Sequence, residues 1–293
     1  MYLVYTQEII TMSKSKTGAV AVRLFFSSVL WLLFTTSCSS ANNPVDAHDH
    51  DSGGNAAPQS AALVELGVLQ DQGVRIELYG PQQQQTGYTP FQVQLIDSAS
   101  GEHIHGAQVE IRPLMNMETD TGTMMHGAPS EGPAVHDHDS GTYTNPVVLL
   151  MPGSWQLQVA YQAGERTGQV AFAAQVQQGS RLVALTGADQ QSYFVALVGP
   201  SHPTVGKQDL EVAVFTRESM MRFPPVADLQ VEMAPFMPSM NHGSPDNEQP
   251  ASMDNGHYLG RVNFIMTGDW RLDLVLKRDD EVVVETQFDL IVE

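Results

Sequence analysis

The chain of 293 residues is short of cysteine and of basic side chains. Its one cysteine is Cys38, so no disulfide can form within the chain, and an unpaired thiol in an exported protein requires another role. Lysine and arginine together number 14 against 33 acidic residues, which gives a net charge of −19. Because phosphate binding needs clustered Lys and Arg, we expect no nucleic acid as a partner. The acidity favours solubility outside the cytoplasm and a mild attraction for cations.

Long apolar runs are also missing, since the run over residues 24–34 is too short to predict a membrane span. Lys14, Lys16 and Arg23 precede this run, and small residues follow it up to Cys38. A basic segment, a short apolar segment and small residues are typical of a secretory signal. We therefore assign residues 1–37 to a signal peptide.

The end of this segment, Thr-Thr-Ser-Cys38, resembles the lipobox of bacterial lipoproteins. The resemblance implies that cleavage leaves Cys38 as a lipid-carrying first residue, which anchors the protein to a membrane of the cell envelope. Ser39 after the cysteine favours the outer membrane where the cell has one. An uncleaved anchor and ordinary secretion are the alternatives.

Residues 38–62 are polar and poor in large apolar side chains, so we expect a disordered, flexible tether there. The tether contains His48-Asp-His50-Asp, and the pattern returns as His136-Asp-His138-Asp. Such tracts can bind metal weakly, although in loops they are more often incidental.

The common catalytic motifs are absent from the sequence. It has no nucleophile elbow, no Gly-rich phosphate loop, no His-Glu-x-x-His and no second cysteine for redox exchange. We expect that the protein is not an enzyme.

One segment of the chain occurs twice, which predicts two copies of one domain. The second copy reads Met237-Pro-Ser-Met240-Asn-His242-Gly243, Gly256-His-Tyr258 and Met266-Thr-Gly268-Asp-Trp270. The first reads Met124-Met-His126-Gly127, Gly141-Thr-Tyr143 and Met151-Pro-Gly153-Ser-Trp155. The offset is 116 from His126 to His242 and 115 from Trp155 to Trp270. Upstream, the first copy carries about six extra residues between Met115 and Met124.

Beyond residue 63 the apolar side chains alternate with a period of two, as at Leu210, Val212 and Val214. Half-buried antiparallel strands produce this pattern. Short strands in units of about 100 residues, with one central Trp each, predict an all-β fold of two tandem immunoglobulin-like β-sandwiches. We place them at residues 63–178 and 190–293.

Two further features are predicted around these domains. Residues 151–155 and 266–270 are expected to form tight hairpin turns, with Gly153 and Gly268 supplying a permissive backbone. The linker at 179–191 is expected to hold a short strand around residues 181–185.

At these residues the chain resembles the YtkA-like family, which is related in pattern to FixH-type periplasmic domains. The second copy carries the resemblance through Met237–Pro245, Gly256–Gly260 and Val262–Arg271. The first copy matches only the Met-His-Gly, Gly-Thr-Tyr and Met-Pro-Gly-Ser-Trp islands. The resemblance implies a small β-sandwich of the bacterial envelope, of a kind often suspected of copper handling.

Methionine and histidine in the repeat suggest a copper site, because copper(I) prefers soft, neutral donors. Met237, Met240 and His242 lie beyond Pro235, where strand alternation stops, so we expect a loop that folds around one ion. Met266 is expected to complete the site from the facing edge.

The predicted ligands of the first copy are Met115, Met124, His126 and Met151. Met117 and Met125 are spare thioethers near this set, and His103 and His105 could add imidazoles to it.

Core packing is the alternative for some of these residues. Met266 lies an even number of positions from Tyr258 and Phe264, so in a strand it would share their inward face. Met151 has the corresponding place in the first copy, and Met commonly fills gaps in cores.

Our leading hypothesis is a lipid-anchored envelope protein that binds copper for transfer, storage or resistance. The competing class is a metal-free adaptor whose exposed Met-rich loops dock on another envelope protein.

Overall fold

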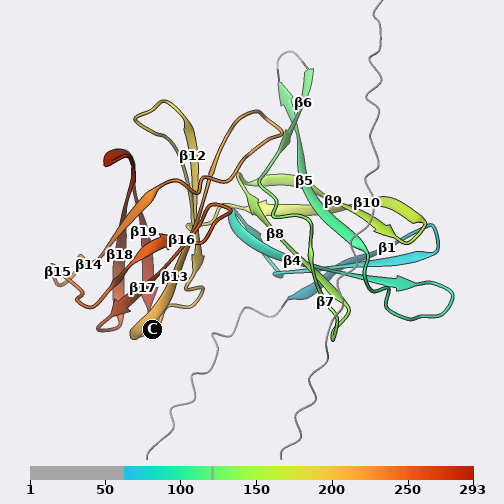
Figure 1. Ribbon diagram of the computed structural model, residues 1–293, viewed down its shortest axis with the longest axis horizontal. Helices are drawn as coiled ribbons and strands as arrows, with labels where there is room; N and C mark the ends of the chain where they lie inside the picture. Colours follow the sequence, from blue (N-terminus) through green and yellow to red (C-terminus); the bar gives the residue numbers. More distant parts are fainter. Residues whose placement is uncertain (1–62, 120–121) are drawn as a thin grey trace, which may run out of the picture. The chain divides into compact units, whose positions relative to one another are not determined.

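The computed structural model describes residues 63–119 and 122–293, which form strands and the turns between them (Figure 1). The expected signal peptide at 1–37 and the expected tether at 38–62, with Cys38, lie outside the described residues. The described residues all belong to one compact unit. Among them, no helix has the length and apolar character that a membrane crossing requires.

The first half of the described chain forms two sheets that enclose one apolar core. The first sheet has the order β1 (Val64–Asp71), β2 (Val74–Gly80), β4 (Gly87–Asp97), β8 (Thr142–Leu149) and β7 (Val135–Asp137). The second has the order β3 (Gln84–Gln85), β10 (Arg166–Gln177), β9 (Gly153–Ala163), β5 (Gln108–Thr119) and β6 (Gly122–Gly127). All of these pairings are antiparallel except that of β3 with β10.

The second half forms another pair of sheets around a core of its own. One has the order β11 (Leu182–Thr186), β12 (Ser192–Gly199), β13 (Gly206–Thr216), β17 (His257–Phe264) and β16 (Glu248–Ser252). The other has the order β15 (His242–Gly243), β14 (Gln230–Met237), β18 (Gly268–Arg278) and β19 (Glu281–Val292). β11 is the short strand that was predicted in the linker.

The two halves follow one plan. The order β1-β2-β4-β8-β7 corresponds to β11-β12-β13-β17-β16, and β10-β9-β5-β6 corresponds to β19-β18-β14-β15. Repeated sequence islands therefore lie at equivalent places in equivalent strands. The prediction of an all-β chain with two tandem immunoglobulin-like sandwiches is confirmed.

The alternation of apolar residues along the strands determines which side chains fill the two cores. Leu210, Val212 and Val214 are fully buried as predicted, and Trp155 and Trp270 are each 1% exposed. Each indole N–H donates to a backbone oxygen four residues earlier, Met151 O or Met266 O, at 3.0 Å. A buried indole needs such a partner, so the turn before β9 or β18 fixes the ring.

The prediction of hairpin turns at 151–155 and 266–270 is wrong. The first turn joins β8 to β9, which pair with different neighbours and belong to facing sheets, and the second joins β17 to β18 in the same way. Gly153 and Gly268 do adopt the expected positive φ, at 133° and 128°. The chain needs this backbone freedom to cross from one sheet to the other.

A third apolar cluster joins the sandwiches within the compact unit. It consists of outward-facing residues of β8, β12 and β13 together with Leu150 and Phe223, namely Val148, Leu150, Phe194, Ala196, Ala213, Phe215 and Phe223. The opposite faces of the same strands line the two cores, so these strands read as continuous apolar runs.

Beside this cluster the His257 ring lies between two carboxylates. Its Nε2 is 2.6 Å from Oε1 of Glu131 in the first sandwich, and its Nδ1 is 2.6 Å from Oε1 of Glu211 in β13. The Tyr88 hydroxyl donates to Glu131 at 2.8 Å. One imidazole thus connects the two halves of the unit.

Candidate metal centre

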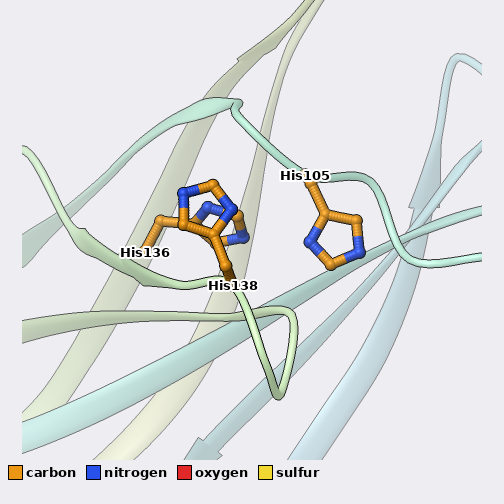
Figure 2. Close-up of side chains that lie close together, drawn as sticks. All are labelled: His105, His136 and His138. Atoms are coloured by element: carbon orange, nitrogen blue, oxygen red, sulfur yellow. The ribbon is translucent and has the colours of Figure 1, made fainter. Parts of the chain in front are cut away.

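Three histidines of the first sandwich converge at one edge of the β7–β8 sheet (Figure 2). His136 lies in β7, His138 follows that strand directly, and His105 comes from the loop between β4 and β5. One ring nitrogen from each residue lies within 4.8 Å of those of the other two. This spacing allows three imidazoles to bind one ion after small side-chain rotations.

The rings are also packed against one another. The ring centroids of His136 and His138 are 4.3 Å apart, and those of His105 and His136 are 5.3 Å apart. His105 and His138 are nearly parallel at 6.4 Å. Residues more than 30 positions apart in sequence are therefore held in contact by the fold.

Tyr143 positions two of these histidines. Its Cα is the register partner of His136, and its ring stacks on that imidazole at 4.3 Å with an interplanar angle of 13°. The Tyr143 hydroxyl donates to Ile104 O at 2.7 Å and accepts from Ala107 N at 3.0 Å. These two bonds fix the loop on either side of His105 to the strand behind His136.

A tight turn after β7 holds the third histidine. Asp137 Oδ1 accepts from Asp139 N at 3.0 Å, and Asp137 Oδ2 accepts from the Ser140 hydroxyl at 2.6 Å. These bonds lower the pKa of Asp137, so the carboxylate stays ionised within the turn. The turn reverses the chain around His138 and keeps its ring beside His136.

His136 is suited to metal binding by its surroundings. Neither of its ring nitrogens has a hydrogen-bond partner within the described part of the chain. Burial lowers its pKa, and the neighbouring His138 and His105 lower it further. A neutral imidazole is the form that binds Zn, Cu, Fe and Ni, and three imidazoles leave a further position for water or another ligand.

The second sandwich keeps the tyrosine but has no such cluster. The Tyr258 hydroxyl donates to Val226 O at 2.8 Å and accepts from Leu229 N at 3.0 Å, as Tyr143 does in the first copy. However, the register partner of Tyr258 is Ser252, where the first copy has His136. The tyrosine bonds therefore belong to the fold, and the imidazoles are an addition to the first copy.

The sequence-predicted ligands of the second copy lie partly elsewhere than expected. Met237 is the last residue of β14 and is 2% exposed, so its prediction as a loop residue is wrong. Alternation continues through Pro235, which faces inward as do Val231 and Met233. His242, in β15, is the register partner of Met237. Met240 lies in the turn between them and is 61% exposed.

Met266 and Met151 lie in the turns that cross between sheets. Met266 is exposed, because β17 ends at Phe264 and the alternation that predicted a core position ends with it. Met151 packs partly buried against the first core. Both contribute their carbonyl oxygens to the tryptophan bonds, and their roles as ligands stay predictions.

The first copy brings three of its predicted ligands, Met115, Met124 and His126, onto one hairpin. Met115 in β5 is the register partner of His126 in β6, and Met117 is the partner of Met124. The ring of His126 lies edge-on to that of Trp155 at 6.2 Å, as the ring of His242 does to that of Trp270 at 6.0 Å. A Met, a His and a Trp thus recur together in both sandwiches.

His105 was predicted only as an additional imidazole, and for His136 and His138 an incidental role was favoured over weak metal binding. The available signal was their spacing of two, because side chains two apart in a strand share a face. The contribution of His105 depends on Tyr143 and on the loop fold, which local sequence does not reveal.

The geometry defines a protein of two like β-sandwiches, the first of which carries a cluster of imidazoles. The YtkA-like family model matches residues 69–160 and 187–275, and the chain belongs to that family through two tandem copies. No curated protein matches the sequence significantly.

Solved structures with similar folds include an adhesin of Escherichia coli, FdeC, at 14% identity and a TM-score of 0.25, covering 78% of this chain and 66% of that one. Domains 5–6 of the S-layer protein SbsC are 11% identical with a TM-score of 0.30, covering 79% and 99%. Invasin, a bacterial integrin-binding protein, is 11% identical with a TM-score of 0.25, covering 74% and 39%. The chain thus spans less than two thirds of the FdeC and invasin chains.

Proposed function

We propose that the protein is a lipid-anchored, copper-binding protein of the bacterial cell envelope, acting in copper transfer, storage or resistance. The observation that carries the proposal is the convergence of His105, His136 and His138 within 4.8 Å. Three nitrogen donors suit copper(II), which binds such sites more tightly than the other divalent first-row metals.

Copper is favoured over zinc by the rest of the donor set. Each sandwich pairs a methionine with a histidine beside a tryptophan. Thioethers suit copper(I), whereas zinc takes thiolate, imidazole and carboxylate ligands. The net charge of −19 adds a general attraction for cations. We propose binding rather than catalysis, because the sequence contains none of the common catalytic motifs.

Copper(II) titration of the purified mature protein tests the proposed site. We expect the His136→Ala and His138→Ala double variant to lose about tenfold or more in affinity, because two of three ligands are removed. His202→Ala, which removes an exposed histidine of the second sandwich, should leave the affinity unchanged. Nitrogen hyperfine structure in the electron paramagnetic resonance spectrum should weaken only in the double variant.

Two results would refute this site. One is an absence of copper(II) binding by the unmodified protein, and the other is an equal loss of affinity in the double variant and in His202→Ala.

The envelope location rests on the expected signal peptide and on Cys38. We expect mass spectrometry of a membrane fraction to find Cys38 acylated at the mature amino terminus, and Cys38→Ser to release the protein from that fraction. A soluble, unmodified chain that begins elsewhere would contradict the anchor.

A further inference from the structure

We propose a second copper site, specific for copper(I), on the β5–β6 hairpin of the first sandwich. Its ligands are the thioethers of Met115, Met117 and Met124 and the imidazole of His126. The site is separate from the histidine cluster and uses softer donors, so it extends the proposed copper binding to the reduced ion.

The strand register places all four side chains on one face of the hairpin. Met115 is directly opposite His126, and Met117 is directly opposite Met124. Directly opposed side chains in an antiparallel pair share a face, with Cβ atoms about 4.5–5.5 Å apart, and residues two apart in a strand also share a face. Three sulfurs and an imidazole therefore form a ladder of two adjacent rungs.

Burial confirms which face this is. Met115 is 7% exposed and belongs to the first core, and Met117 packs against that core. On the other face, Asn116 and its register partner Met125 are exposed, with Met125 51% exposed. The ladder thus faces inward, and its outer rung is completed by Met124 at 43% exposure.

His126 supplies an observation that packing does not explain. Its side chain is 2% exposed, and its Nδ1 has no partner with good hydrogen-bond geometry among the described residues. Burial lowers the pKa of this imidazole, and the backbone of Gly127 opposes that shift only in part. A buried polar atom without a partner is costly, which favours a ligand at this position. The ring is held edge-on to Trp155 at 6.2 Å and lies 5.5 Å from the Phe223 ring, so its orientation is fixed by aromatic neighbours.

The second sandwich shows which parts of the ladder the fold itself requires. Its counterpart is Met237 opposite His242, with His242 edge-on to Trp270 at 6.0 Å. That hairpin is shorter, and His242 has its Nδ1 2.8 Å from Gly243 O. The outer rung of two thioethers exists only in the first copy, where the extra residues lengthen the hairpin.

Core packing accounts for Met115, Met117 and Met237 but not for Met124. An exposed Met124 opposite Met117 buries little surface, whereas two thioethers beside a buried imidazole form a donor set for a soft ion. Exposure falls from 43% at Met124 to 7% at Met115, so the ladder extends from the surface to the core.

The test uses the full mature protein carrying His136→Ala and His138→Ala, so the histidine cluster does not contribute. Copper(I) is added under anaerobic, reducing conditions in competition with bicinchoninate. In this background, Met117→Leu with Met124→Leu should lower the copper(I) affinity about tenfold or more. The matched control is Met125→Leu with Met253→Leu, which replaces two exposed methionines outside the ladder; it should leave affinity unchanged.

X-ray absorption of the copper(I) form gives a readout that a structural role would not change. We expect sulfur and nitrogen neighbours in the background protein, and fewer sulfur neighbours in the Met117→Leu and Met124→Leu variant. Equal affinity losses in the test and control variants, or a copper(I) environment of nitrogen and oxygen alone, would overturn the proposal. If the histidine cluster fails to bind copper(II), the site proposed at that cluster is refuted. The copper(I) measurement on the β5–β6 hairpin is independent of that result.

Discussion

At the residue scale, Tyr143 has two roles, one in the fold and one in the imidazole cluster, and its counterpart Tyr258 has only the first. Its hydroxyl makes the bonds to Ile104 and Ala107 that Tyr258 makes to Val226 and Leu229 in the second sandwich. Only Tyr143 also stacks on a histidine. The pair therefore distinguishes support of the fold from support of the imidazole cluster.

Tyr143→Phe and Tyr258→Phe should each lower the free energy of unfolding by about 1–3 kcal/mol, because each leaves a buried backbone group without its partner. Only Tyr143→Phe should weaken copper(II) binding, since it frees the loop that carries His105. Denaturant unfolding and copper(II) competition measure the two effects. Equal effects of both variants on copper binding would show that Tyr143 does not position the cluster.

At the element scale, the strands and cores could be predicted from the sequence because burial follows local alternation. The buried tryptophans and the strand at Leu182–Thr186 followed from the same signal. The turns at Gly153 and Gly268 could not be assigned correctly. Gly and Pro mark a reversal of the chain, but whether the next strand pairs with the previous one or crosses to the facing sheet depends on the whole sandwich.

The candidate sites show the same division between local and long-range information. The residue types Met and His, and their recurrence, were visible in the sequence. The ladder of Met115, Met117, Met124 and His126 depends on hairpin register, and one residue of slip would move these side chains to the other face. The histidine cluster depends on contacts between segments more than 30 residues apart, which periodicity does not report.

At the scale of the whole molecule, His257 makes the contact between the sandwiches dependent on pH. Its hydrogen bonds to Glu131 and Glu211 raise its pKa to about 9, although burial opposes this. Both ring nitrogens face carboxylates, so the bound form is the imidazolium. The usual pKa of an unfolded histidine is about 6.5.

Because the folded pKa is the higher one, the stabilisation by His257 is complete below about pH 6.5 and is lost as the pH rises through about 9. We expect the melting temperature of the mature protein to fall across this range, and the fall to be smaller in His257→Gln. Calorimetry at a series of pH values measures it, with the exposed His202→Gln as control. A melting temperature that falls equally in His257→Gln and in the unmodified protein would contradict this role.

The tryptophan pockets have a practical consequence. The chain has three tryptophans, and Trp31 lies in the expected signal peptide, so the mature protein would emit from Trp155 and Trp270 alone. Both indoles are 1% exposed and bonded to a carbonyl four residues back, so both should emit as buried indoles. Trp155 lies beside His126 of the longer hairpin, and Trp270 lies beside His242 of the shorter one. The emission of the mature protein therefore reports on both cores together, and replacing either indole by Phe would leave a signal from the other sandwich alone.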